Sequence, residues 1–134
     1  MKKKGSTCDY TAMRNDDLRQ TFKRCLAQHD ARCVYDIFEL MTRQPAKRFY
    51  ISEQRAYRLV YARRKGREWP EKMMPSRRRM MEEIFCRVQR RMSRTPSASL
   101  ADVVFEVVNE PAPSFYMTRG SIKTIFYDFR KRQL

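Results

Sequence analysis

The stretch that decides the fold is "PAKRFYISEQRAYRLVYARRKG", residues 45–66, because the chain repeats its pattern as "PAPSFYMTRGSIKTIFYDFRKR", residues 111–132. The two stretches align without a gap at a constant offset of 66 residues. The identical pairs are Pro45 with Pro111, Ala46 with Ala112, Phe49 with Phe115, Tyr50 with Tyr116, Tyr61 with Tyr127, Arg64 with Arg130 and Lys65 with Lys131. Self-similarity on this scale indicates a duplicated supersecondary unit.

The similarity continues upstream of both stretches. "DIFELM", residues 36–41, corresponds to "DVVFEVV", residues 102–108, and "LRQTFKRCL", residues 18–26, corresponds to "MEEIFCRVQ", residues 81–89. The second pair sets Phe22 opposite Phe85. Chance similarity in a basic sequence is the alternative. The ungapped match and the preserved order favour duplication.

Each repeat is expected to form three helices, because its apolar residues recur at helical spacing. The first helix of each repeat has the apolar positions Leu18, Phe22, Cys25 and Leu26, or Met81, Ile84, Phe85 and Val88. The second, which begins after Asp30 in one copy and near Ser99 in the other, buries Ile37, Phe38 and Met41, or Val103, Val104, Val107 and Val108. A proline in each copy, Pro45 or Pro111, ends it.

The third helix of each repeat has a clear start signal. Ser52 and Thr118 are natural N-caps, since their hydroxyls accept hydrogen bonds from backbone N–H groups of the first turn. Ser99, with Asp102 three residues later, resembles a capping box for the second helix of the second repeat. The aromatic pair before each third helix is expected to anchor its loop in the core.

The expected fold is all-α, a tandem duplication of a trihelical, helix-turn-helix-like unit with about six helices. Residues 1–14 are expected to form a basic, disordered tail, 15–66 the first unit, 67–76 a linker and 77–134 the second unit. The two units either pack as one domain or swing on the linker. The connection before Ser52 is longer than a usual helix-turn-helix turn, so the unit is only similar to that motif.

The charge of the chain points to a polyanionic partner. It carries 30 Lys and Arg against 15 Asp and Glu, a net charge of +15. Residues 1–66 contribute 16 basic and 7 acidic side chains, and residues 67–134 contribute 14 and 8, so the excess is not confined to a tail. Such a field attracts nucleic acid. An acidic protein is the alternative partner.

The solvent face of the third helices is the candidate nucleic-acid site, because cations pair with phosphates and tyrosine stacks on nucleotides. Its residues are Gln54, Tyr57, Arg58, Tyr61, Arg64, Lys65, Lys123, Tyr127, Arg130 and Lys131. A secondary basic patch comprises Arg77, Arg78, Arg79, Arg87, Arg90 and Arg91. Alternatively, the tyrosines pack on neighbouring helices and the cations are simply solvated. Trp69, in the linker, either seals the two units or lies exposed, and sealing is favoured.

Enzyme, metal and cofactor chemistry find little support. The cysteines Cys8, Cys25, Cys33 and Cys86 form no C-x-x-C pair and His29 is the only histidine, which argues against a zinc site. No Gly-rich phosphate loop or nucleophile–base pair is present, so we expect a non-enzymatic protein without a cofactor. Without a signal peptide or an apolar run of about 20 residues, a cytoplasmic protein is expected.

The segments "RFYISEQRA" and "NEPAPSFYMTRGSIKTI" resemble small basic proteins carried by bacterial prophages and other mobile elements. The resemblance covers roughly residues 15–132 and implies a bacterial or phage setting beside a recombinase or reverse transcriptase, but it transfers no site residue. We therefore expect a nucleic-acid-binding accessory protein, with duplex DNA favoured and RNA second. The alternative is a protein-interaction or structured-RNA-binding subunit of a mobile-element enzyme.

Overall fold

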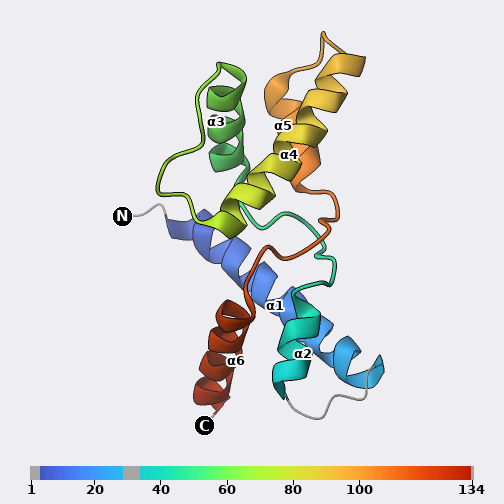
Figure 1. Cartoon of the computed structure of the whole chain (residues 1–134), viewed down its shortest axis with the longest axis vertical. Coiled ribbons are helices and arrows are strands. Elements are labelled where there is room, and N and C mark those ends of the chain that lie inside the picture. The colour runs from blue at the N-terminus through green and yellow to red at the C-terminus, as the bar shows by residue number, and fades with distance from the viewer. Residues whose placement is uncertain (1–3, 29–33, 134) are drawn as a thin grey trace. The chain divides into compact units, whose positions relative to one another are not determined.

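The computed structural model describes the backbone of residues 4–28 and 34–133, and the side chains of residues 10–28 and 36–128. Within those ranges the chain is all-helical and has no strand (Figure 1). Its helices are α1 (Lys4–Gln28), α2 (Val34–Met41), α3 (Glu53–Arg64), α4 (Pro75–Arg94), α5 (Leu100–Val108) and α6 (Arg119–Gln133). The all-α class and the six helices predicted from the sequence are confirmed.

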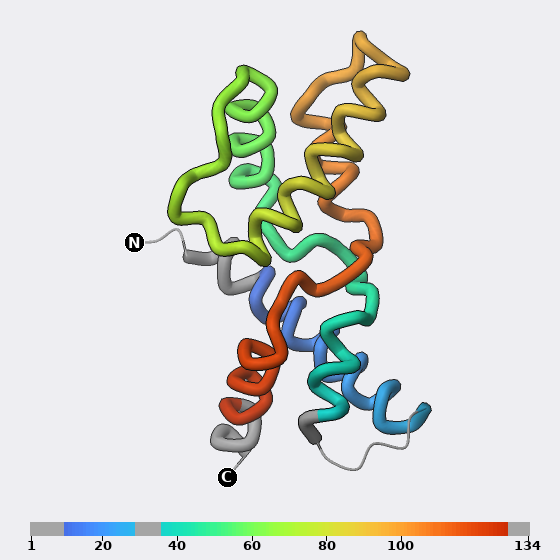
Figure 2. Tube along the Cα trace, in the orientation of Figure 1, coloured from blue at the N-terminus to red at the C-terminus, as the bar shows by residue number. Residues whose placement is uncertain are grey.

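The helices form two compact units. An inserted unit, Lys47–Ala112, contains α3, α4 and α5, and an outer unit, made from the chain up to Ala46 and from Pro113 onward, contains α1, α2 and α6. Figure 2 lets the chain be followed from α2 into α3 and later from α5 into α6. This grouping differs from the expected units 15–66 and 77–134, because the third helix of each expected repeat lies with the first two helices of the other.

The predicted N-caps are confirmed by their hydrogen bonds. The Ser52 hydroxyl accepts from the Arg55 N–H at 3.1 Å, and the Ser99 hydroxyl accepts from the Asp102 N–H at 3.3 Å. The Thr118 Oγ1 atom likewise accepts from the backbone N–H three residues on, at 3.1 Å. Each cap satisfies one of the N–H groups that a helix leaves free in its first turn. The local sequence therefore sets where α3, α5 and α6 begin.

The connection between α3 and α4 is bounded by a glycine and a proline. Gly66 has φ 91°, a left-handed conformation that ends α3 because it suits glycine and strains other residues. Pro75 occupies the first turn of α4, where its missing N–H costs nothing. The helix therefore includes the last two residues of the expected linker 67–76 and starts two residues before the expected second unit, 77–134.

The inserted unit buries one apolar side of each of its three helices. Its buried apolar residues on the helices are Ala56, Val60, Met80, Met81, Ile84, Val88, Val103, Val104, Val107 and Val108. Trp69 joins them at 6% exposure; its ring lies edge-on to Phe85, with centroids 6.0 Å apart. The Trp69 indole N–H also donates to Glu82 Oε2 at 2.7 Å. Trp69 is thus buried and bound to α4, so it is not the exposed side chain of the alternative prediction; it lies within the inserted unit.

The outer unit is built around an aromatic cluster. The Phe126 ring of α6 lies 4.8 Å from the Phe22 ring of α1 and 5.5 Å from the Phe38 ring of α2, centroid to centroid. Its fully buried residues include Leu18, Ile37, Met41 and Ile122. Cys25 is also buried, which raises the pKa of its thiol. Leu26, expected to be apolar core, is instead 51% exposed.

The expected disordered tail over residues 1–14 is wrong for the part that the structure describes. The helix α1 begins at Lys4, and residues 4–28 contain no proline that would interrupt it. Tyr10 is partly buried, and burial lowers the pKa of Arg14. Residues at the end of the expected tail are thus packed against the fold. Residues 1–3 lie outside the described range.

The loop that leads into α3 is held by a buried arginine, which sequence analysis did not single out. Arg48 is 7% exposed, and its guanidinium donates to the Phe49 and Ile51 carbonyls and to Asn109 Oδ1, each at 2.9 Å. The Phe49 N–H donates to the Val108 carbonyl at 3.0 Å. These bonds tie the beginning of the inserted unit to its end. Phe49 and Phe115 are both buried, as predicted for the aromatic anchors.

Candidate nucleic-acid interface

The exposed face of α3 is the strongest candidate site in the chain. Ala56 and Val60 are fully buried against the inserted unit, so the opposite side of the helix faces solvent. Gln54, Arg58, Tyr61, Arg64 and Lys65 are exposed, as the sequence predicted, and Tyr57 is half-buried. Six of the ten predicted binding residues therefore lie on this one helix and its C-cap.

The two tyrosines of α3 form a stack along the helix. The Tyr57 and Tyr61 ring centroids lie 6.0 Å apart with an interplanar angle of 30°, and the Lys65 ammonium lies 5.3 Å from the Tyr61 ring. The spacing of four residues places these side chains one above the other. Tyr61 keeps 45% of its surface exposed. The result is an ordered aromatic and cationic surface, and not a scatter of solvated side chains.

The cations on this face are not neutralised within the described part of the chain. Arg55, Arg58 and Lys65 form no ion pair there. Arg64 donates to Gln89 of α4. Arg55 was not among the predicted site residues, although it lies three residues before Arg58 and thus on a neighbouring part of the face. Helical spacing alone was sufficient to find it.

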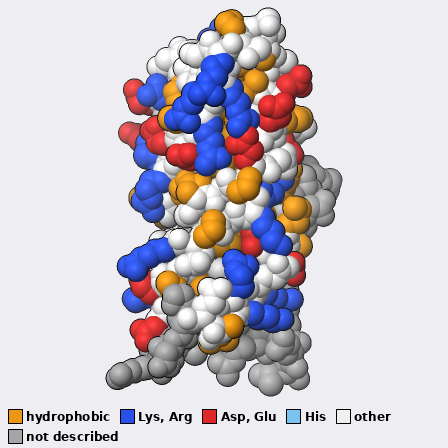
Figure 3. Space-filling model, turned by 90° about the vertical axis from the view of Figure 1, so that its right-hand side faces the viewer, with side chains coloured by type: hydrophobic (Ala, Val, Ile, Leu, Met, Phe, Trp, Pro, Cys, Tyr) orange, Lys and Arg blue, Asp and Glu red, His pale blue; other side chains and the backbone are white. Residues whose placement is uncertain are grey.

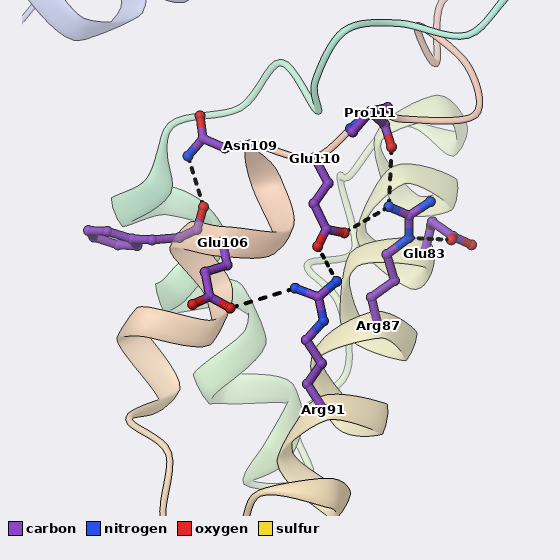
Figure 4. Close-up of polar contacts among 8 residues, drawn as sticks. Glu83, Arg87, Arg91, Glu106, Asn109, Glu110 and Pro111 are labelled. Atoms are coloured by element: carbon purple, nitrogen blue, oxygen red, sulfur yellow. Dashed lines mark hydrogen bonds and ion pairs between the residues drawn. The ribbon is translucent and has the colours of Figure 1, made fainter.

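By contrast, two arginines of the predicted basic patch form ion pairs with carboxylates (Figure 4). Arg87 pairs with Glu83 at 2.8 Å and with Glu110 at 3.2 Å. Arg91 pairs with the other Glu110 oxygen and, at 3.7 Å, with Glu106. Arg87 also donates to the Pro111 carbonyl at 3.2 Å.

This network bears on the prediction that Arg87 and Arg91 form part of a basic patch. Their positive charge is balanced inside the unit, because the carboxylates come from α4 itself and from α5 and the residues that follow it. The remaining patch residues lie along α4. Arg79 and Arg90 are exposed, while Arg77 and Arg78 are partly buried.

In the inserted unit, some basic side chains are thus paired with carboxylates, and others have no ion pair among the described residues. It holds 16 basic and 8 acidic side chains, a net charge of +8. In the upper part of Figure 3, where this unit lies, Lys and Arg side chains have Asp and Glu side chains beside them on the face shown. Five carboxylates accept hydrogen bonds or form ion pairs inside the unit, those of Glu53, Glu82, Glu83, Glu106 and Glu110. Only three of its carboxylates remain to offset the cations of α3.

The predicted residues of α6 belong to the outer unit. Tyr127 is 47% exposed, and the Lys123 ammonium lies 5.4 Å from its ring. This repeats the contact of Lys65 with Tyr61, but from the residue four positions before the tyrosine. The side chains of Arg130 and Lys131 lie outside the described residues. The ten predicted residues thus divide between the two units.

A cavity of about 370 Å³ lies between the end of α4 and the start of α5. Its wall includes Arg91 and Arg94 but also Asp102 and Glu106. These opposite charges give it no preference for an anion. The face of α3, where cations are unopposed, is a better match for a phosphate backbone.

Other site classes have no counterpart in the described part of the chain. No three His, Cys, Asp or Glu side chains gather there in a group suited to a metal ion. None of its helices is both long and apolar enough to cross a bilayer. Comparison with protein-family models, with curated proteins and with solved structures gave no match.

Proposed function

We propose that this protein binds nucleic acid without catalysing a reaction, and that the exposed face of α3 is its main contact surface. The observation that carries the proposal is the charge separation in the inserted unit. Most of its carboxylates are engaged within the unit, whereas Arg55, Arg58 and Lys65 on α3 have no ion pair among the described residues. A phosphate backbone supplies the missing negative charge.

Duplex DNA is the preferred ligand in this proposal. Arg58 and Lys65 lie seven residues apart, so they are spaced by about 10 Å along the helix axis and can reach different phosphates. Affinity then comes mainly from counterion release and falls with added salt. The exposed Tyr61 adds a hydrogen-bonding or stacking contact.

The proposal includes a duplicated, helix-turn-helix-like organisation and a mobile-element setting. Its support is the repeated sequence, in which Tyr61 and Tyr127 occupy equivalent positions and both stay about half exposed. Each carries a lysine ammonium near its ring. In this proposal two such helices give one chain two contact surfaces, and the protein acts beside a recombinase or reverse transcriptase of a mobile element.

A titration compares the candidate ligands directly. Fluorescence anisotropy is measured for labelled duplex DNA of about 25 base pairs, its single strand and an RNA hairpin, between about 50 and 200 mM salt. The expected result is tightest binding to the duplex, with log affinity falling linearly as log salt rises. Tightest binding to the hairpin makes the protein an RNA binder. Absence of binding to all three below about 100 μM removes nucleic acid and directs the search to an acidic protein.

Charge-reversal variants locate the surface. Arg58→Glu with Lys65→Glu is expected to weaken duplex binding at least tenfold and to lower the salt slope by about 2, one for each lost phosphate contact. The matched control is Lys72→Glu with Arg94→Glu, which makes the same change in net charge at exposed positions of the same unit. Equal losses in both variants would show that α3 is not the contact surface.

A further inference from the structure

The C-terminal helix α6 lies on α1 and α2, although the whole inserted unit separates it from them in the sequence. Ile122 is fully buried, and Phe126 completes the aromatic cluster with Phe22 and Phe38. At the surface Arg119 pairs with Glu39 at 3.7 Å. These contacts specify that α6 is the helix that covers α1 and α2. They are the same whether α6 comes from the same chain or from a second copy.

The segment that leads into α6 contains a strained backbone conformation, a positive φ at a residue other than glycine. Tyr116 has φ 56°, and no other non-glycine residue there has a positive φ. This left-handed conformation is unfavourable for a residue with a bulky side chain. The Tyr116 N–H donates to the Ser114 hydroxyl at 2.7 Å, which holds the reversal in place. The strained residue stands three positions before the start of α6.

We infer that α6 can be exchanged between two copies of this chain, giving a dimer in which the outer unit of each copy holds the partner's α6. The hinge is the segment 116–118, which extends and releases the strain at Tyr116. Phe115 keeps its buried place in its own chain. Exchange of an identical element preserves every packing contact and is a low-cost route to a dimer. A strained hinge favours it further. The inference does not depend on the proposed function.

The expected dissociation constant follows from the tether and the strain. A helix on a short tether competes with a second copy at an effective concentration of about 1 mM. Releasing one strained residue in each of two hinges favours the dimer by about 30-fold. The dimer is therefore expected to form at tens of micromolar protein.

The first test measures the oligomeric state and the identity of the exchanged helix. Sedimentation of the unmodified full-length chain, from about 10 μM to about 1 mM, is expected to show a monomer–dimer equilibrium. Two full-length variants without native cysteines, Glu39→Cys and Arg119→Cys, are then mixed, refolded together and treated with a short bis-maleimide. A covalent dimer containing one chain of each kind is expected, because these positions meet only when α6 of one chain lies on α2 of the other. A monomer throughout the range, or a dimer without the mixed crosslink, overturns the inference.

The second test changes the hinge. Tyr116→Gly removes the penalty of the positive φ and is expected to weaken the dimer by about 30-fold. Tyr116→Ala is the matched control, since it also removes the aromatic ring but keeps the Cβ atom that makes the conformation unfavourable. Equal dissociation constants for the two variants would rule out hinge strain as the driving force. Far-UV circular dichroism of each variant verifies that it is folded.

Discussion

The buried Arg48 offers a quantitative test of how the inserted unit is held together. In an Arg48→Met variant the side chain keeps a flexible apolar stem but loses its three hydrogen bonds of 2.9 Å. Asn109 is exposed and its amide oxygen can turn to water, and the Phe49 carbonyl still accepts from the Ile51 N–H at 3.0 Å, so the Ile51 carbonyl is the acceptor that loses its donor. Each unsatisfied buried acceptor costs about 1–3 kcal/mol. Part of this cost is offset, because the cation no longer has to be desolvated. We expect a net destabilisation of about 1–2 kcal/mol.

The chain provides its own reporter for the measurement. Trp69 is the only tryptophan and is buried in the inserted unit, so its fluorescence follows the unfolding of that unit in urea. For a unit of this size the free energy of unfolding falls by about 1 kcal/mol per molar urea, so the urea midpoint should drop by about 1–2 M. Arg48→Lys keeps the charge but replaces the planar fork by a single ammonium, and it should fall between the wild type and Arg48→Met.

The control for this prediction is Lys72→Met, which removes the same charge at an exposed position of the same unit. Its free energy of unfolding should stay within about 0.5 kcal/mol of the wild type, as is usual for a surface substitution. If Arg48→Met behaves like this control, the hydrogen bonds of Arg48 do not stabilise the loop that leads into α3, and the reasoning fails.

Three further outcomes are expected. Trp69→Phe loses the indole hydrogen bond to Glu82 and should lower the free energy of unfolding of the inserted unit by about 1–2 kcal/mol. Circular dichroism in urea measures this change, and a value below about 0.5 kcal/mol would contradict the prediction. Brief iodoacetamide treatment near pH 8 should label the exposed Cys86 before Cys25, because burial shields Cys25 and raises the pKa of its thiol, which reduces its thiolate fraction; peptide mapping that shows equal labelling would refute this. Phe126→Ala opens the aromatic cluster of the outer unit and should cost about 2–4 kcal/mol, and an unchanged thermal transition would show that α6 is not held by this ring.

The different ion pairing of the arginines shows the limit of predicting a binding surface from composition. Arg58 and Arg87 are alike in the sequence, and both were assigned to basic surfaces. The structure leaves Arg58 without an ion pair among the described residues, but it gives Arg87 two carboxylates, one of which comes from Glu110 beyond α5. Helical spacing alone indicates the Glu83 partner, four residues before Arg87, and the ion pair is present. The partner from beyond α5 depends on tertiary structure alone.

The sequence by itself determined the helices and their ends. Periodic apolar residues, N-caps such as Ser52 and Thr118, and prolines such as Pro45 act within a few residues of the chain, so their effect is visible before folding. The solvent face of α3 was predicted for the same reason, because the burial of Ala56 on one side of a helix fixes what the other side presents. The expected tail was wrong because no proline between Lys4 and Arg14 keeps α1 from extending through that segment.

Only the tertiary structure decided which helices pack together. Phe22 and Phe85 are aligned with each other in the predicted repeat, but the Phe22 ring contacts Phe126 of α6, whereas the Phe85 ring contacts Trp69. The α3 residue equivalent to Phe126 is Val60, which is too small to fill the same place and would leave a cavity beside Phe22. The match in size between side chains far apart in sequence therefore selects the partner of each third helix. Such a match is not visible in the periodicity of either segment.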